Sequence, residues 1–163
     1  MRKIKWLPGM LFAGLLLHTQ NAQAQIGSDS HTATVQVSTI TAVQVSSGTV
    51  NMNIMGASIV AGQDQMSIVD QTTSLLWGIN SSTKKITVNS NLASPIFTLK
   101  VLAFSPTVGT AASEVTLNTT AADFMLNVGK SSGSCTLKYT GIALASQGTG
   151  SDVHTITFTV QTQ

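Results

Sequence analysis

Apolar residues at every second position, repeated along most of the chain, are the feature that most limits how this sequence can fold. A period of two places apolar side chains on one face of a β-strand and leaves the other face to polar side chains. The residues in between are mostly threonine, serine, asparagine and glutamine, which suit the solvent-facing side of an antiparallel sheet. The alternating apolar sets are Val35/Val37, Val43/Val45, Val50/Met52/Ile54, Leu75/Trp77/Ile79, Ile86/Val88, Phe97/Leu99/Val101, Val115/Leu117, Phe124/Leu126/Val128, Cys135/Leu137/Tyr139 and Ile156/Phe158/Val160.

Turn-forming residues divide these alternating sets into short strands. No segment has the period of an amphipathic helix, and turns at this spacing are typical of two packed sheets. We therefore predict an all-β fold, an immunoglobulin-like antiparallel β-sandwich of two sheets, which forms a single domain over residues 25–163. The turn signals lie at residues 46–48, 61–64, 80–83, 105–109, 129–133 and 147–150.

The alternation changes phase near the start of this predicted domain. Val37 and Val43 stand at odd positions and Ile40 at an even one, so an unbroken strand would turn Ile40 to the wrong face. We predict a bulge, or a switch of the strand from one sheet to the other, near residues 38–41.

The first 24 residues have the three parts of a secretory signal peptide. Three basic residues precede an apolar run over residues 6–17, and a small-residue cleavage site follows at residues 21–24. We predict cleavage after Ala24 and a bacterial source. The mature chain is then secreted, to the periplasm, the cell surface or the extracellular medium.

Loss of the signal peptide changes the charge of the protein. The whole chain has eight Lys and Arg residues and six Asp and Glu residues. Arg2, Lys3 and Lys5 belong to the signal peptide, so five lysines and no arginine face six acidic residues, a formal charge of −1. This charge excludes a nucleic-acid partner, because phosphate contacts need clustered basic residues. No later apolar stretch approaches the roughly 20 residues of a membrane span, and the lone Cys135 excludes an internal disulfide.

A repeat links the two ends of the predicted domain. Residues 27–37 read G-S-D-S-H-T-A-T-V-Q-V, and residues 150–160 read G-S-D-V-H-T-I-T-F-T-V. The simpler interpretation is a shared strand entry, in which Gly and Ser form the turn and Asp accepts hydrogen bonds from backbone N–H groups.

The alternative interpretation of the repeat is a metal site. If the first and last strands pair in parallel and in register, their Asp-x-His segments meet at one end of the domain. Two imidazoles and two carboxylates can bind a divalent metal ion, and without metal the two imidazoles would form a pH-responsive pair. The candidate ligands are Asp29, His31, Asp152 and His154.

Enzymatic chemistry has little support in this sequence. The motifs of serine hydrolases, zinc proteases, phosphate-binding loops and EF-hands are missing. Cys135 alternates with Leu137 and Tyr139, which indicates a buried apolar residue rather than a nucleophile. Asp64 and Asp70 flank a loop-like stretch and are a candidate carboxylate pair, although solvated loop acids are the simpler interpretation. We predict a non-enzyme with no catalytic residues and no cofactor apart from the candidate metal.

Carbohydrate binding is the alternative function for a small exported β-sandwich. Such modules stack aromatic rings on sugar faces, but Trp77 shares its phase with Leu75 and Ile79, which favours a place in the core. Tyr139 shares its phase with Leu137 in the same way. Sugar contacts would therefore have to come from Asn, Gln and Asp side chains in loops.

Four segments give the chain a family resemblance. They read HTATVQV from His31, LWGIN from Leu76, KKITV from Lys84 and HTITFTV from His154. In this order they resemble a group of small exported bacterial β-sandwich proteins with no assigned activity, which implies the fold and the location but no functional residues. The architecture is also similar to that of pilin-type and adhesin-type sandwiches, which polymerise by strand donation. The paired cysteines common in chaperone-usher pilins are absent.

The sequence thus favours a structural or adhesive role at the cell surface, in a matrix or in a fibre. Faces rich in Thr and Ser with a weak net charge promote association. Strand edges can add to the sheet of another copy or of another surface protein. A glycan-binding module is the alternative, and an enzyme is a distant third.

Overall fold

The structure is a computed structural model, which describes residues 30–55 and 60–163. The predicted signal peptide and Asp29 lie outside the described residues. The chain divides into two units, Met1–Gln36 and Val37–Gln163. The described residues of the first unit, 30–36, are exposed and form no helix or strand.

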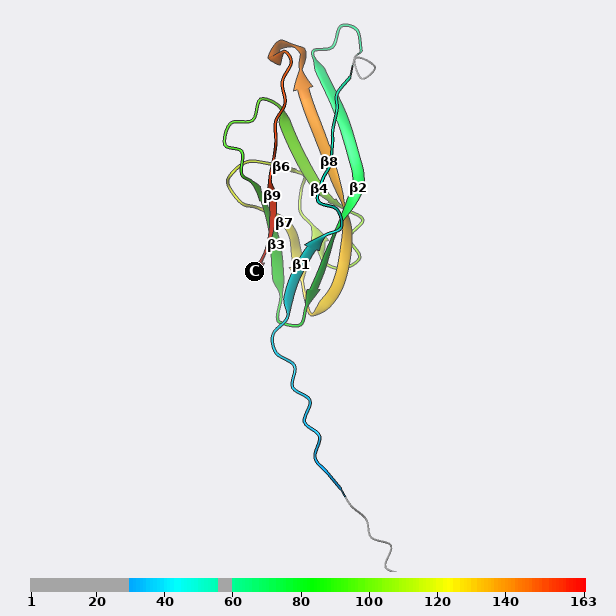
Figure 1. Ribbon diagram of the computed structural model, residues 1–163, viewed down its shortest axis with the longest axis vertical. Coiled ribbons are helices and arrows are strands. Elements are labelled where there is room, and N and C mark those ends of the chain that lie inside the picture. The colour runs from blue at the N-terminus through cyan, green and yellow to red at the C-terminus, as the bar shows by residue number, and fades with distance from the viewer. Residues whose placement is uncertain (1–29, 56–59) are drawn as a thin grey trace, which may run out of the picture. The chain divides into compact units, whose positions relative to one another are not determined.

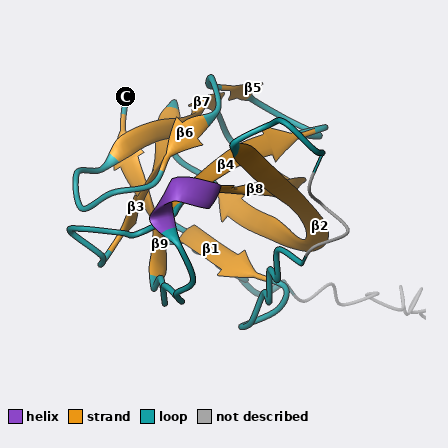
Figure 2. Ribbon diagram, turned by 90° about the horizontal axis from the view of Figure 1, so that it is seen from above, coloured by secondary structure: helices purple, strands orange, loops and turns teal. Residues whose placement is uncertain are grey.

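The second unit is a β-sandwich of two antiparallel sheets, which confirms the predicted all-β class (Figure 1). One sheet has the order β1-β2-β8-β4-β6 and the other the order β5-β7-β3-β9, and the two face each other when seen end-on in Figure 2. All of the strand pairs are antiparallel. The elements are β1 (Thr41–Val45), β2 (Gln65–Ile79), β3 (Lys84–Ser90), β4 (Thr98–Phe104), β5 (Thr110–Ala111), β6 (Val115–Thr116), β7 (Ala122–Val128), β8 (Ser131–Leu144), the 3-10 helix η2 (Ala145–Gln147) and β9 (Ile156–Thr162).

The core lies between the two sheets and consists of the inward members of the alternating sets. Trp77 is 4% exposed, Tyr139 5% and Cys135 3%, so the prediction that these three side chains are buried is confirmed. Phe124 packs edge-on against Phe158 with ring centroids 5.1 Å apart, an arrangement that aromatic pairs favour.

A bulge divides β2 into two halves with opposite phase. The register of the β2–β8 ladder shifts between Asp70 and Thr73, and the carboxylate of Asp70 accepts hydrogen bonds from the N–H and the hydroxyl of Thr72. Before the shift the even-numbered Ile68 faces inward, and after it the odd-numbered Leu75 does. The stretch between Asp64 and Asp70, which we expected to be loop-like, is therefore the first half of a long strand, because the bulge conceals the continuity of its pattern.

Two alternating sets do not form strands. Val35 and Val37 are 89% and 70% exposed, and they have no ladder partner among the described residues. Residues 50–54 pack beside the core without joining a sheet. The β1–β2 ladder ends at Val45, and two further hydrogen bonds join Ser46 and Ser74, from Ser46 N to the carbonyl oxygen of Ser74 (2.9 Å) and from Ser74 N to the hydroxyl oxygen of Ser46 (2.8 Å), next to the bulge in β2.

Asn80 holds the chain where it enters the domain. Its side chain accepts a hydrogen bond from Ile40 N (2.6 Å) and donates one to the carbonyl oxygen of Ser38 (2.7 Å). These two bonds extend the β1–β2 pairing beyond the first ladder pair, Thr41 and Ile79. The ladder is regular from Thr41 to Val45 and β1 pairs only with β2 among the described residues, so neither the bulge nor the sheet switch that we predicted near residues 38–41 interrupts this strand, and the phase changes before it begins.

Replacement of Asn80 by alanine is expected to release residues 38–40. Loss of two hydrogen bonds at this exposed site should lower the free energy of unfolding by about 1 kcal/mol and speed hydrogen exchange at Ile40 N. Exchange measured by NMR tests this expectation. Asn118→Ala is the matched control, because Asn118 caps only Thr120, and it should leave Ile40 unchanged. Equal protection of Ile40 in both variants would contradict the role of Asn80.

Candidate functional site

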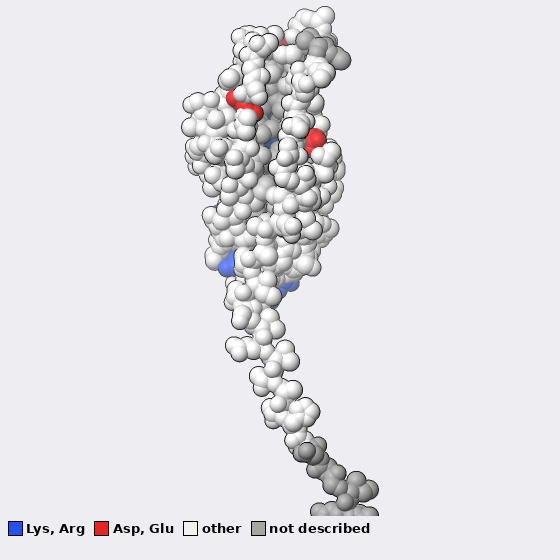
Figure 3. Space-filling model, in the orientation of Figure 1, with Lys and Arg blue, Asp and Glu red and all other residues white. Residues whose placement is uncertain are grey.

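A groove lies between the edges of the two sheets of the sandwich. The groove has a volume of about 1030 Å³, with residues 45–54 along one side and residues 148–158 along the other. Ile68 of β2 and Leu99 of β4 contribute to its floor. Figure 3 shows the groove as a hollow between two ridges in the upper part of the domain.

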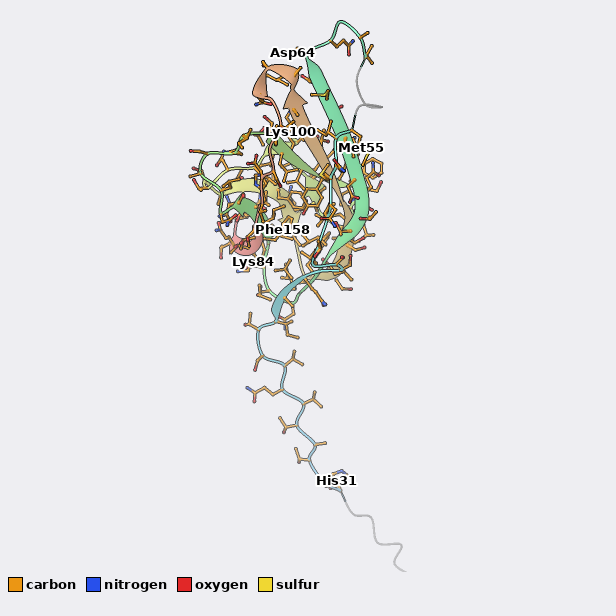
Figure 4. All side chains as sticks on the ribbon, turned by 45° about the horizontal axis from the view of Figure 1, so that its top comes forward. His31, Met55, Asp64, Lys84, Lys100 and Phe158 are labelled. Atoms are coloured by element: carbon orange, nitrogen blue, oxygen red, sulfur yellow. The ribbon has the colours of Figure 1, made fainter. Side chains whose placement is uncertain are left out.

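Unequal strand lengths create this groove. β2 and β8 have 15 and 14 residues, whereas β3 and β9 of the opposite sheet have seven each. The first half of β2 pairs with the last half of β8, from Gln65 opposite Leu144 to Asp70 opposite Tyr139, and extends past the opposite strands. In Figure 4, Asp64 marks this extended end and Lys84 the other part of the domain. The inner face of the extension therefore lines the groove instead of packing on a second sheet.

The groove has apolar side chains among a lining that is also rich in Ser, Thr, Asn and Gly. On one side Met52 lies over Gly141, where an added Cβ would be 3.3 Å from the Met52 methyl carbon and 3.3 Å from Ile68. On the other side Ile156 and Phe158 of β9 face inward and are only half-buried. A second cavity of about 210 Å³ continues between β1 and β9 and shares Val45, Ile156 and Phe158 with the first. Both cavities follow the two neighbouring edge strands.

Hydrogen bonds fix the side of the groove that precedes β9. The carboxylate of Asp152 accepts a bond from Phe97 N at 2.7 Å, and the ring Nδ1 of His154 is bonded to the hydroxyl oxygen of Ser90 at 2.9 Å. Thr155 N donates to the side chain of Asn91 at 2.7 Å. Asp152 therefore anchors this wall through a backbone N–H, and His154 anchors it through a side chain. The hydrogen bond of Asp152 agrees with the simpler interpretation of the Gly-Ser-Asp repeat, in which Asp accepts hydrogen bonds from backbone N–H groups.

The four candidate metal ligands are not assembled by the described residues. Asp29 lies outside them, His31 is exposed in the first unit, and Asp152 and His154 line the groove in the second. Among residues 30–55 and 60–163, no group of three or more His, Cys, Asp or Glu side chains could hold a metal ion. β9 pairs only with β3 within that part of the chain, so the parallel pairing on which the metal site depended is not formed there. The metal site stays a prediction.

The other side chains that we considered for catalysis are Cys135, Asp64 and Asp70, and the structure gives none of them a catalytic arrangement. Burial raises the pKa of Cys135 to about 11, against the opposing effect of a hydrogen bond with the backbone of Leu75, so the thiol is protonated at neutral pH. Asp64 accepts a hydrogen bond from Ser146 N (3.2 Å). Asp64 and Asp70 lie six residues apart on an extended strand, roughly 20 Å, so they do not form the carboxylate pair that we considered.

Sequence reasoning missed the groove, although it contained a signal for it. Met66 and Ile68 alternate at even positions, whereas Leu75 and Trp77 alternate at odd positions. A change of phase without a turn signal between the sets indicates one bulged strand, not a loop followed by a strand. That longer strand is the one that leaves the groove uncovered.

Comparisons with known proteins give no relative from which a role could be transferred. No protein-family model, no curated protein and no solved structure matches this chain significantly. In the part of the chain that the structure describes, no helix is long and apolar enough to cross a membrane.

Proposed function

We propose that the protein is a secreted, non-enzymatic structural component of a bacterial cell surface, matrix or fibre, and that it associates through the edges of its sheets. The observation that supports this most is the pair of edge strands, β1 and β9, which border a groove with both apolar and polar lining residues. Edge strands present unpaired backbone N–H and C=O groups, and apolar side chains in a groove beside them add contacts to such pairing.

Few charges oppose this association. Lys and Arg are sparse on the face seen in Figure 3, as are Asp and Glu. Of the 27 residues that line the groove, only Tyr139, Asp152 and His154 are ionisable. A nearly neutral surface repels other copies weakly, and a glycan-binding role has less support because Trp77 and Tyr139 are buried.

We further propose that the sandwich is immunoglobulin-like. The order β1-β2-β8-β4 corresponds to strands A, B, E and D of that fold, and the β3–β9 pair corresponds to strands C and F. Strand G of such a fold would lie on the free edge of β9, which no strand covers among the described residues. The proposal thus identifies the side of the groove where an extra strand would complete a sheet.

Export and self-association can be measured on the same preparation. Expression in a bacterium with periplasmic mass spectrometry should give an N-terminus at Gln25, and a chain that begins at Met1 would contradict the signal peptide. Light scattering after size exclusion, with negative-stain microscopy, should then show oligomers or fibres that grow with concentration. A strict monomer at the highest concentration reached would overturn the proposed function.

A further inference from the structure

We propose that residues 31–37 of one copy bind as an added β-strand in the groove of a second copy, along the free edge of β9. This inference rests on the proposed function, since it names the segment and the surface by which copies associate. It is carried by a segment that has the pattern of a buried strand but joins no sheet among the described residues, and by a groove with apolar side chains in its lining beside an unpaired edge.

The donor segment has one apolar face and contains no Lys, Arg, Asp or Glu. Ala33, Val35 and Val37 alternate with Thr34 and Gln36. The valines are 89% and 70% exposed, which is costly for side chains that gain free energy when buried. A strand of this pattern is expected to bury the valine face and leave the threonine face to solvent.

The repeat in the sequence shows which strand the donor matches. Residues 31–37 align with residues 154–160, where Ile156, Phe158 and Val160 face inward from β9. Each of the three apolar positions of the donor thus corresponds to an inward position of β9. Their common spacing allows a strand laid along β9 to turn the same face toward the groove.

The length of β9, whose first residues Ile156 and Phe158 line the groove, and the charge of the groove agree with such a strand. The donor and β9 each have seven residues, which is roughly 23 Å of extended chain. The groove walls contain no Lys, Arg or Glu, and their one carboxylate, Asp152, already accepts a hydrogen bond from Phe97 N, so a strand without Lys, Arg, Asp or Glu brings no opposing charge. The backbone groups of β9 on the side away from β3 supply the hydrogen bonds of the added strand.

The way the chain enters the domain favours a second copy over the same copy. Asn80 holds Ser38 and Ile40 in line with β1, at its Thr41 end, whereas the groove begins at Val45. A return into its own groove would need a reversal of the chain within this segment. Residues 31–37 contain no Gly, Pro, Asn, Asp or Ser, the residues that dominate tight turns, which disfavours such a reversal.

The first test compares two double variants of the mature chain. Val35→Asp with Val37→Asp puts two charges on the apolar face, and Thr34→Asp with Gln36→Asp puts the same charges on the polar face of the same segment. Since burial of each valine is worth a factor of about ten or more in affinity, the first variant should assemble at least about 100-fold more weakly by light scattering. The second should stay within about threefold of the unmodified chain.

The second test supplies the donor in trans. A fluorescent peptide with the sequence of residues 30–40 should bind the Val35→Asp/Val37→Asp chain one to one, because its groove is intact and empty. Ile68→Asp in the floor should weaken this binding at least tenfold. Ile54→Asp, in the segment outside the sheets, repeats the test at a position that the fold tolerates more easily, and circular dichroism verifies the fold of both.

The outcomes separate this inference from the proposed function. Assembly of Val35→Asp/Val37→Asp at wild-type strength, or peptide binding that both groove variants retain, would overturn the donor strand while self-association stands. A monomeric unmodified chain that binds the peptide neither before nor after the valine substitutions would overturn both. If residues 31–37 instead insert into the groove of their own copy, the unmodified chain is a monomer that does not bind the peptide, and the Val35→Asp/Val37→Asp chain binds it. This result also overturns the inference.

Discussion

Replacement of Trp77 by alanine is expected to lower the free energy of unfolding by about 3–5 kcal/mol, the usual cost of removing a large aromatic side chain from a core. Trp77 lies directly opposite Gly133 in the β2–β8 ladder, and its ring covers that glycine so closely that an added Cβ would be 2.6 Å from a ring carbon. The indole therefore fills the space that a side chain at Gly133 would occupy. Denaturant unfolding of the monomeric chain measures the loss.

Two further variants separate the packing of the ring from its polar group. The Nε1 of Trp77 is buried with no hydrogen-bond partner, so Trp77→Phe removes an unsatisfied donor along with some volume, and it should cost less than about 1 kcal/mol. Gly133→Val should destabilise the unmodified chain by about 1–3 kcal/mol through overpacking. In the Trp77→Ala background the same valine should stabilise instead. Additive effects of the two substitutions would contradict the proposed contact.

The second large expected effect is a loss of stability in alkali. Burial raises the pKa of Cys135 from 9.0 to about 11, and burial together with the nearby Asp70 and Cys135 raises that of Tyr139 from 10.0 to about 12. The folded chain keeps both protons at a pH where the unfolded chain releases them. The contribution of these two groups to the free energy of unfolding is therefore fully present below their unfolded pKa values and is lost between pH 9 and 11 for Cys135 and between pH 10 and 12 for Tyr139, by about 2–3 kcal/mol for each group.

Substitution of either group should remove its share of this pH dependence. Urea unfolding of Cys135→Ala should show a smaller loss of stability between pH 9 and pH 11 than the unmodified chain does. Tyr139→Phe should show a smaller loss between pH 10 and pH 12. A stability that is the same at pH 8.5 and pH 11.5 in the unmodified chain would contradict the burial argument for both groups.

Much of the fold could be predicted from the sequence, because the inward or outward direction of a strand residue depends only on its neighbours. The alternation of Leu75, Trp77 and Ile79 identified a buried strand face directly. The order of the strands could not be predicted, since the pairing of β2 with β8 depends on residues far apart in the chain. Alternation also predicted strands at residues 35–37 and 50–54, where the described residues offer no ladder partner.

The candidate site was harder to predict, because it depends on a defect in a pattern. Gln71 and Thr72 are ordinary polar strand residues, and nothing in their identity announces the bulge. Only the change from even to odd inward positions across them carried that information. The repeat around His31 and His154 was visible from the start, but its most direct chemical interpretation, a shared metal site, needed a pairing that the described strands do not make.

The bulge in β2 has a consequence for how this protein can vary. Residues after the bulge, such as Leu75, belong to the core that keeps the domain folded, whereas residues before it, such as Ile68, line a surface open to a ligand. One strand thus serves two purposes that are separated by two residues. If the groove binds the proposed donor strand, substitutions in the first half would alter which strand is accepted while the second half preserves the fold, so specificity and stability could evolve independently along a single β-strand.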